Sequence, residues 1–295
     1  MNQITLETVM NAFNNDVALS TQDMMLYGRN KDSIPMLVES LKTASTKQQI
    51  NAVDFVSDLG RVLIPADDMF PERPGPVIVE PDVVEYLVDQ LANDQKEIRN
   101  IACVNLAALV PGSLFQNHND KIISALSRYP HTDGIIVLLG KVNSPKAIQL
   151  LKDPEIGGAS AEDYEMAMAR LGDKQAEASI IAKYKNASEP QEKAEIARRL
   201  GYVSSDKTIQ LLAEEIRTPE YYEWHPPAIR SLRIHIIEGL HLAYMEEPVF
   251  WQPIIQPEDD SYYEKIENWL NKKLGITWKN NRPEFLYQIE SPIMP

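Results

Sequence analysis

Apolar and polar positions repeat together along this chain, most clearly in two segments that are nearly the same. "LGKVNSPKAIQLL" at 139–151 returns as "LGYVSSDKTIQLL" at 200–212, with nine of thirteen positions identical. After Leu-Gly and a polar turn, isoleucine and leucine recur three residues apart, as Ile148 and Leu151 do in the first copy. This spacing puts the apolar side chains on one face of a helix. The pattern predicts helices joined by short turns, used more than once.

A third, weaker copy shows the period of the repeat. "RLGDKQAEASIIAKY" begins at Arg170, so Leu-Gly pairs start at 139, 171 and 200. Glycine after leucine predicts a left-handed helix end, and Ser144 before Pro145 predicts the start of the next helix. Ser205 or Asp206 is expected to start the matching helix. A period near thirty residues is typical of stacked helical hairpins.

The N-terminal half carries a longer version of the unit. Residues 32–45 and 46–60 are predicted to form one helix pair, and residues 80–94 and 95–110 a second. In the last of these helices Ile98, Ala102 and Leu109 share a face with Asn105, which is the odd polar member. We therefore expect an all-α protein.

These residues also carry a family resemblance. "LVDQLANDQKEIRNIACVNLAAL" resembles a HEAT repeat, and the Leu-Gly units resemble the shorter HEAT-like repeats of phycobilin lyases, over roughly residues 30–217. The resemblance implies an α-α superhelix, that is, a right-handed solenoid of helical hairpins. It also implies that Asp94 and Arg99 hydrogen-bond between adjacent repeats.

Two segments interrupt the repeat and suggest how the chain is organised. Residues 64–81 contain five prolines and are predicted to be an extended insertion. From Pro219 onward the pattern changes to a helix at about 227–246, a loop, and a helix at 261–275. We expect a repeat array over residues 1–218 and an atypical, aromatic-rich helical cap over residues 219–295, continuous with the array.

Charge narrows the range of partners. The 295 residues carry a formal net charge of −14, which disfavours binding to nucleic acid or to an anionic membrane surface. The charge is expected either to attract a basic protein partner or simply to keep the protein soluble. The single cysteine, Cys103, lies in an apolar helix and is expected to be a core thiol. No signal sequence or membrane span is predicted, so a cytoplasmic location is the default expectation.

Motifs for chemistry are few. The sequence has no phosphate-binding loop, nucleophile elbow, paired-cysteine zinc site or calcium loop. His235, Glu238 and His241 are the best metal-like set, but the two histidines diverge by about 120° around one helix. We therefore expect no metal, no cofactor and no catalytic residues.

Aromatic and acidic residues give the candidate binding set. All four tryptophans lie between residues 224 and 278, where they either seal the end of the array or bind a partner. Acidic pairs in predicted loops are expected to steer a basic partner. The candidate binding residues are Tyr221, Tyr222, Trp224, His225, Phe250, Trp251, Asp67, Asp68, Asp259 and Asp260.

These features predict a non-catalytic protein-binding scaffold or inhibitor that presents an acidic surface, such as an immunity-type inhibitor of a basic toxin. The alternative is an enzyme or cofactor lyase built on the same array, which a bound metal or chromophore would reveal. A regulatory adaptor would differ by stable co-purification with its complex. The oligomeric state stays open between a monomer and a weak dimer.

Overall fold

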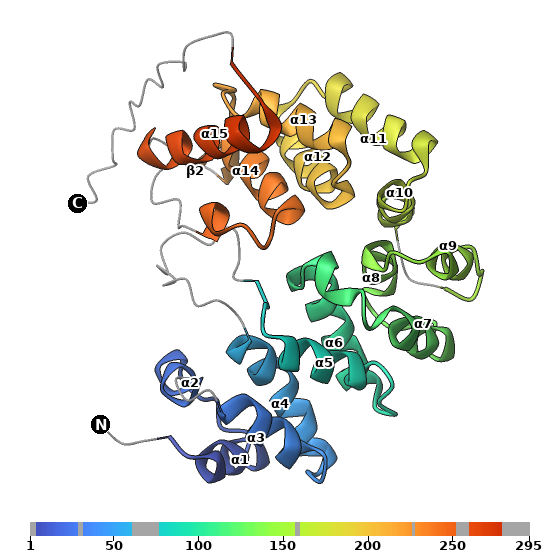
Figure 1. Cartoon of the computed structure of the whole chain (residues 1–295), viewed down its shortest axis with the longest axis vertical. Helices are drawn as coiled ribbons and strands as arrows, with labels where there is room; N and C mark the ends of the chain where they lie inside the picture. Colours follow the sequence, from blue (N-terminus) through green and yellow to red (C-terminus); the bar gives the residue numbers. More distant parts are fainter. Residues whose placement is uncertain are drawn as a thin grey trace. The chain divides into compact units, whose positions relative to one another are not determined.

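The computed structural model describes residues 4–28, 32–60, 77–156, 160–225, 228–251 and 260–278. Within these ranges the chain is helical apart from one two-stranded hairpin, so the all-α prediction is confirmed (Figure 1). The chain forms two compact units that divide between residues 178 and 179, inside one helix. The sequence placed the change in packing about forty residues later, at Pro219.

The first unit is built from short helices joined by tight turns. They are α1 (Leu6–Asn14), α2 (Thr21–Gly28), α3 (Ser33–Leu41), α4 (Thr46–Leu59), α5 (Pro81–Gln90), α6 (Lys96–Leu109), the 3-10 turn η1 (Gly112–Phe115), α7 (Asn119–Arg128), α8 (Ile135–Lys141), α9 (Pro145–Leu151), α10 (Ala161–Arg170) and the start of α11 (Lys174–Asn186). The predicted helix start at Ser144 is present, because its side chain accepts a hydrogen bond from the Lys146 N–H. Ser45 and Ser160 cap α4 and α10 in the same way, and in the second unit Ser205, rather than Asp206, caps the matching helix.

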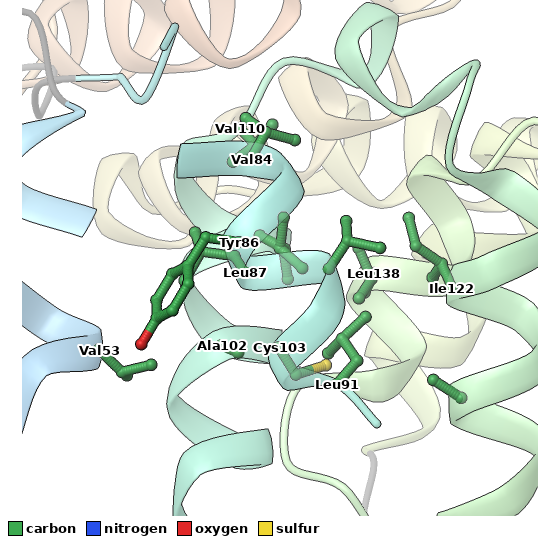
Figure 2. Close-up of a cluster of buried hydrophobic side chains, with 14 of the residues drawn as sticks. Val53, Val84, Tyr86, Leu87, Leu91, Ala102, Cys103, Val110, Ile122 and Leu138 are labelled. Carbon is green, nitrogen blue, oxygen red and sulfur yellow. The ribbon is translucent and has the colours of Figure 1, made fainter. Parts of the chain in front are cut away.

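Helices of successive hairpins pack side by side in this unit. α4, α6, α8 and α10 contact one another in that order, while α3 packs against α5 and α7 against α9. One continuous core of buried side chains runs from α1 to α10. Figure 2 shows part of it, with Leu87 of α5, Leu91 just after that helix, Ala102 and Cys103 of α6 and Leu138 of α8. Each hairpin therefore covers the apolar face of its neighbour.

The second unit contains the rest of α11, then α12 (Pro190–Val203), α13 (Asp206–Glu215), β1 (Tyr221–His225), β2 (Ala228–Ser231), α14 (Leu232–Ala243), the 3-10 turn η2 (Pro248–Trp251) and α15 (Asp260–Leu274). β1 and β2 pair antiparallel, where the sequence predicted a loop followed by the start of a long helix. The helix begins instead at Leu232, because the Ser231 hydroxyl accepts a hydrogen bond from the Arg233 N–H and caps it.

α14 is the central helix of the second unit. Nine of its twelve residues are buried, which is far more than one face of a helix can supply. α12, α13 and β2 all pack against it. This unit therefore surrounds one buried helix rather than continuing the side-by-side succession of the first.

The closest helix crossing in the second unit joins α12 and α14 at two glycines. A Cβ atom built on Gly201 would lie 1.9 Å from the carbonyl oxygen of Gly239, and one built on Gly239 would lie 2.5 Å from the carbonyl oxygen of Ala197. Both positions must be glycine for the backbones to come this close. Gly201 was predicted to end its helix in a left-handed conformation, but it lies inside α12, and Ser204 takes that conformation with φ 56°.

Candidate functional site

Most of the predicted binding residues fall where the structure is not described in full. Asp67, Asp68 and Asp259 lie outside the described residues. Tyr221, Tyr222, Trp224 and His225 form strand β1, Trp251 ends η2 and Asp260 begins α15, but the side chains of these six lie outside the described part of the chain. Their proposed role in binding stays a prediction.

Phe250 is the one member of that set whose side chain the structure describes, and it is fully buried. Its ring lies 5.2 Å from the Trp269 ring in an edge-to-face arrangement and stacks at 6.3 Å on Tyr244. The edge of His241 completes the cluster. Because a side chain with no exposed surface cannot contact a partner, Phe250 is corrected from a binding residue to a core residue.

Other C-terminal aromatic residues are packed in a similar way. The Tyr263 ring lies 3.4 Å below the buried guanidinium of Arg233, and the Trp278 indole N–H donates to the Ala213 carbonyl at 3.2 Å. Arg217 sits over Trp278 and makes a two-pronged ion pair with Glu267. These contacts favour the alternative weighed for the aromatic-rich segment, in which large side chains seal a fold.

The metal-like set on α14 is used in packing. His235 Nδ1 lies 3.0 Å from a carboxylate oxygen of Glu238, while the ring of His241 is buried against Phe250. The two histidines therefore face different surroundings, as their spacing around the helix required. Within the described ranges no three His, Cys, Asp or Glu side chains gather as metal ligands.

Asp94 and Arg99 both contact the next hairpin through Tyr129, and Asp94 also lies 3.6 Å from the guanidinium of Arg128. The Tyr129 hydroxyl donates to Asp94 at 2.9 Å, and the Arg99 guanidinium lies 3.9 Å from the centre of the Tyr129 ring. Arg99 also donates to the carbonyl of Asn93 in its own turn at 2.7 Å. The family resemblance implied a contact between repeats; the tyrosine that makes it was missed, because nothing in its local sequence marks it.

Three ion pairs join charged side chains on or next to α3, α5, α7 and α9. Asp89 of α5 pairs with Lys121 of α7, and Asp120 of α7 pairs with Lys146 of α9 at 2.9 Å. On α3, Glu39 holds Lys42 and raises the pKa of that lysine. Lys42, Lys121 and Lys146 therefore each form an ion pair with an acidic residue of the same chain.

A different arrangement is found along α4, α6 and the start of α8. Asn105 of α6 donates to Asp54 of α4 at 3.2 Å, and Asn100 of α6 donates to Asp133 at 2.7 Å. The Asp133 backbone N–H returns a bond to the Asn100 side chain at 3.1 Å. Both carboxylates are held in place by neutral amides, and within the described residues neither has a cationic partner.

α6 also carries an exposed apolar side chain, which lies in sequence between Asn100 and Asn105, the residues that bind these carboxylates. Val104 is 47% exposed, although its neighbours Ala102, Cys103 and Leu106 are fully buried. Gly134 lies beside it in the left-handed conformation, with φ 78°, so this position adds no side chain over the valine. This exposure could not be predicted from the sequence, since a valine in an apolar helix carries no sign of it.

One buried titratable group was also missed. Lys141 ends α8, and its ammonium group donates to the Val110 carbonyl at 3.0 Å in the interior of the first unit. Burial, with a smaller effect of the nearby Arg170 charge, lowers the pKa of Lys141 to about 7. The second copy of the repeat has Tyr202 at the position of Lys141, and that tyrosine is also buried. The tyrosine at the matching position is the one indication in the sequence that Lys141 is buried.

Comparison with known proteins gives no relative: no family model matches the chain, and no match is found to curated proteins or to solved structures. The resemblance to HEAT-like repeats therefore stays a prediction based on the residues quoted above. Among the helices that the structure describes, none is both long and apolar enough to cross a membrane.

Proposed function

We propose that this chain works without catalysis, by binding a basic protein partner through the acidic surface of its first unit. The observation that carries the proposal is that many lysines of this unit are paired with acidic side chains, while further acidic side chains have no cationic partner among the described residues. Lys42, Lys47, Lys121, Lys146 and Lys174 each pair with an acidic residue of the same chain. Acidic side chains remain in excess, and those of Asp54 and Asp133 are oriented by amides alone.

An excess of fixed negative charge on packed helices favours a positively charged partner and speeds its approach. Stacked helical hairpins also supply a long, fairly rigid surface at little entropic cost on binding. An inhibitor that covers a basic toxin is one form of this function. The proposal places the chain in the cytoplasm. Its single cysteine is free and buried, as is usual in that reducing compartment.

The experiment that tests the proposal is affinity capture with the purified full chain. The chain is immobilised at a micromolar concentration and exposed to an extract of its source cells at low ionic strength. We expect one or a few proteins of high isoelectric point to be retained and to elute as the salt concentration rises. Retention of acidic proteins only, or of none, would contradict the proposal. An absorbance spectrum and elemental analysis of the same preparation test the enzyme or lyase alternative.

A further inference from the structure

We propose that one defined face of the first unit, formed by Asp54, Val104 and Asp133, is the docking surface for a segment of a protein partner that presents an apolar side chain flanked by two cationic ones. We call it the α6 face. This inference rests on the proposed function and adds to it the location of the surface and the pattern of the segment.

The α6 face lies on the exposed side of a helix that is packed on both flanks. α6 lies between α4 and α8 and buries most of its circumference. Its exposed positions are Lys96, Glu97, Val104 and Ala108, and three more, Asn100, Ile101 and Leu109, are partly exposed. Among them Glu97, Asn100, Val104 and Ala108 recur at three- and four-residue steps, so these four form one stripe along the helix. Asp54 has the same pattern of buried neighbours on α4 that Val104 has on α6.

Leaving Val104 exposed has a cost. Burying an exposed aliphatic side chain stabilises a complex by about 25 cal/mol per Å² of apolar surface removed from water. Gly134 keeps the space beside Val104 open: its φ of 78° favours glycine, and a Cβ there would lie 3.3 Å from Val104 Cγ2. An apolar side chain from a partner therefore finds an accessible contact at the centre of the stripe.

Two carboxylates lie close to α6. Asp54 and Asp133 flank the valine-bearing helix on its two sides, because the first is bonded to Asn105 and the second to Asn100 of α6. Amide hydrogen bonds fix the direction of each carboxylate and leave its negative charge without a cationic partner in the described part of the chain, so a partner cation can pair with it. Asp89 of α5 and Asp120 of α7 differ, since each is already paired with a lysine of the same chain. Asp82 and Glu85 of α5 form no ion pair among the described residues, so they match the charge of the α6 face in the control variant below.

The test compares two variants of the full chain that change charge and apolar surface by the same amount. The α6-face variant carries Asp54→Asn, Val104→Gln and Asp133→Asn. The control variant carries Asp82→Asn, Glu85→Gln and Met36→Gln, three exposed positions on α5 and α3. Urea denaturation of both confirms that each folds. The protein retained by the wild-type chain is identified, purified and titrated against all three.

We expect the α6-face variant to bind that partner at least about tenfold more weakly, with a smaller dependence on salt, and the control variant to bind like the wild type. Equal binding by all three chains, equal loss in both variants, or loss in the control alone would overturn the α6 face while leaving the proposed function in place. Failure of the wild-type chain to retain any basic protein would overturn both.

A second readout does not depend on these substitutions. A photoreactive p-benzoylphenylalanine placed at position 104 is expected to crosslink to the purified partner, and the same group placed at position 36 is not. Both positions are about half exposed, so the fold tolerates the change at either. Crosslinking from position 36 but not from position 104 would place the partner on another face and overturn the inference.

Discussion

The guanidinium of Arg99 lies 3.9 Å from the centre of the Tyr129 ring, so that a residue near the start of α6 stacks on the residue that ends α7. Arg99 is nearly buried, and its position is fixed from behind by a 2.7 Å hydrogen bond to the Asn93 carbonyl. Tyr129 in turn donates to the exposed carboxylate of Asp94. One tyrosine thus joins the turn and the second helix of one hairpin to the next hairpin.

We predict that Arg99→Met destabilises the protein by about 1–3 kcal/mol, because it removes a buried charged hydrogen bond and a cation–π contact while keeping most of the side-chain volume. Tyr129→Phe keeps the ring and loses only an exposed hydroxyl bond, so its cost should stay below about 1 kcal/mol. Urea denaturation measures both. If the effects of Arg99→Met and Tyr129→Leu simply add in the double variant, the stacking contact contributes nothing.

Gly201→Ala should be among the most damaging single methyl additions in the second unit. The new Cβ would overlap the carbonyl of Gly239, so α12 and α14 must separate, and we expect a loss of about 3 kcal/mol or more in the free energy of unfolding. Thermal and urea denaturation measure the loss.

Two other substitutions serve as controls for that glycine. Gly275→Ala meets no atom within 4 Å but has φ 68°, so only backbone strain of about 1 kcal/mol is expected. Ser204→Gly, at φ 56°, should be neutral or stabilising by up to about 1 kcal/mol. A Gly201→Ala variant no less stable than Gly275→Ala would show that α12 and α14 do not cross as closely as described.

The same dipeptide shows how far the sequence could predict this fold. Leu-Gly was expected to end a helix each time, and Gly172 does so with φ 100°, whereas Gly140 and Gly201 lie inside α8 and α12. Helix starts were predicted well, because a cap such as Ser144 before Pro145 acts through local hydrogen bonds. The role of Gly201 depends on a helix that arrives about forty residues later, which no local pattern can show.

The candidate site shows the same limit in another form. Acidic character could be read from composition, but whether a carboxylate is neutralised depends on its neighbours: Asp89 meets Lys121, whereas Asp54 meets the amide of Asn105. Aromatic residues were expected to bind a partner or to seal the fold, and the burial of Phe250 shows the second role at that position. Burial of a particular ring is a tertiary property that aromatic clustering in the sequence does not determine.

Cys103 should not react with thiol reagents while the protein is folded. Its thiol is fully buried in α6, and burial raises the pKa of the thiol well above its usual value, so very little thiolate forms. Incubation with N-ethylmaleimide at pH 8 should leave the native mass unchanged, and the same incubation in concentrated urea should add one adduct. Rapid labelling of the native chain would mean that the α5–α6 core opens readily.

Lys141 should make stability depend on pH in a defined direction. Its pKa is lowered to about 7 in the folded chain, against about 10.4 for an ordinary lysine in the unfolded chain. Between these values the unfolded chain binds the proton more tightly, so the contribution of Lys141 to the free energy of unfolding rises with pH from about 7 to about 10.

Lys141→Met removes that dependence and keeps an apolar chain of similar length. We expect the variant to be more stable than the wild type at pH 7, by on the order of 3 kcal/mol, and the difference to shrink as the pH approaches 10. Other titrating groups, including Cys103, act equally on both chains and cancel in the difference. Lys152→Met, at an exposed position, should change stability by less than about 0.5 kcal/mol at either pH. A constant difference between Lys141→Met and the wild type across this range would show that Lys141 stays protonated in the folded chain, since only a proton lost on folding can make the two curves converge.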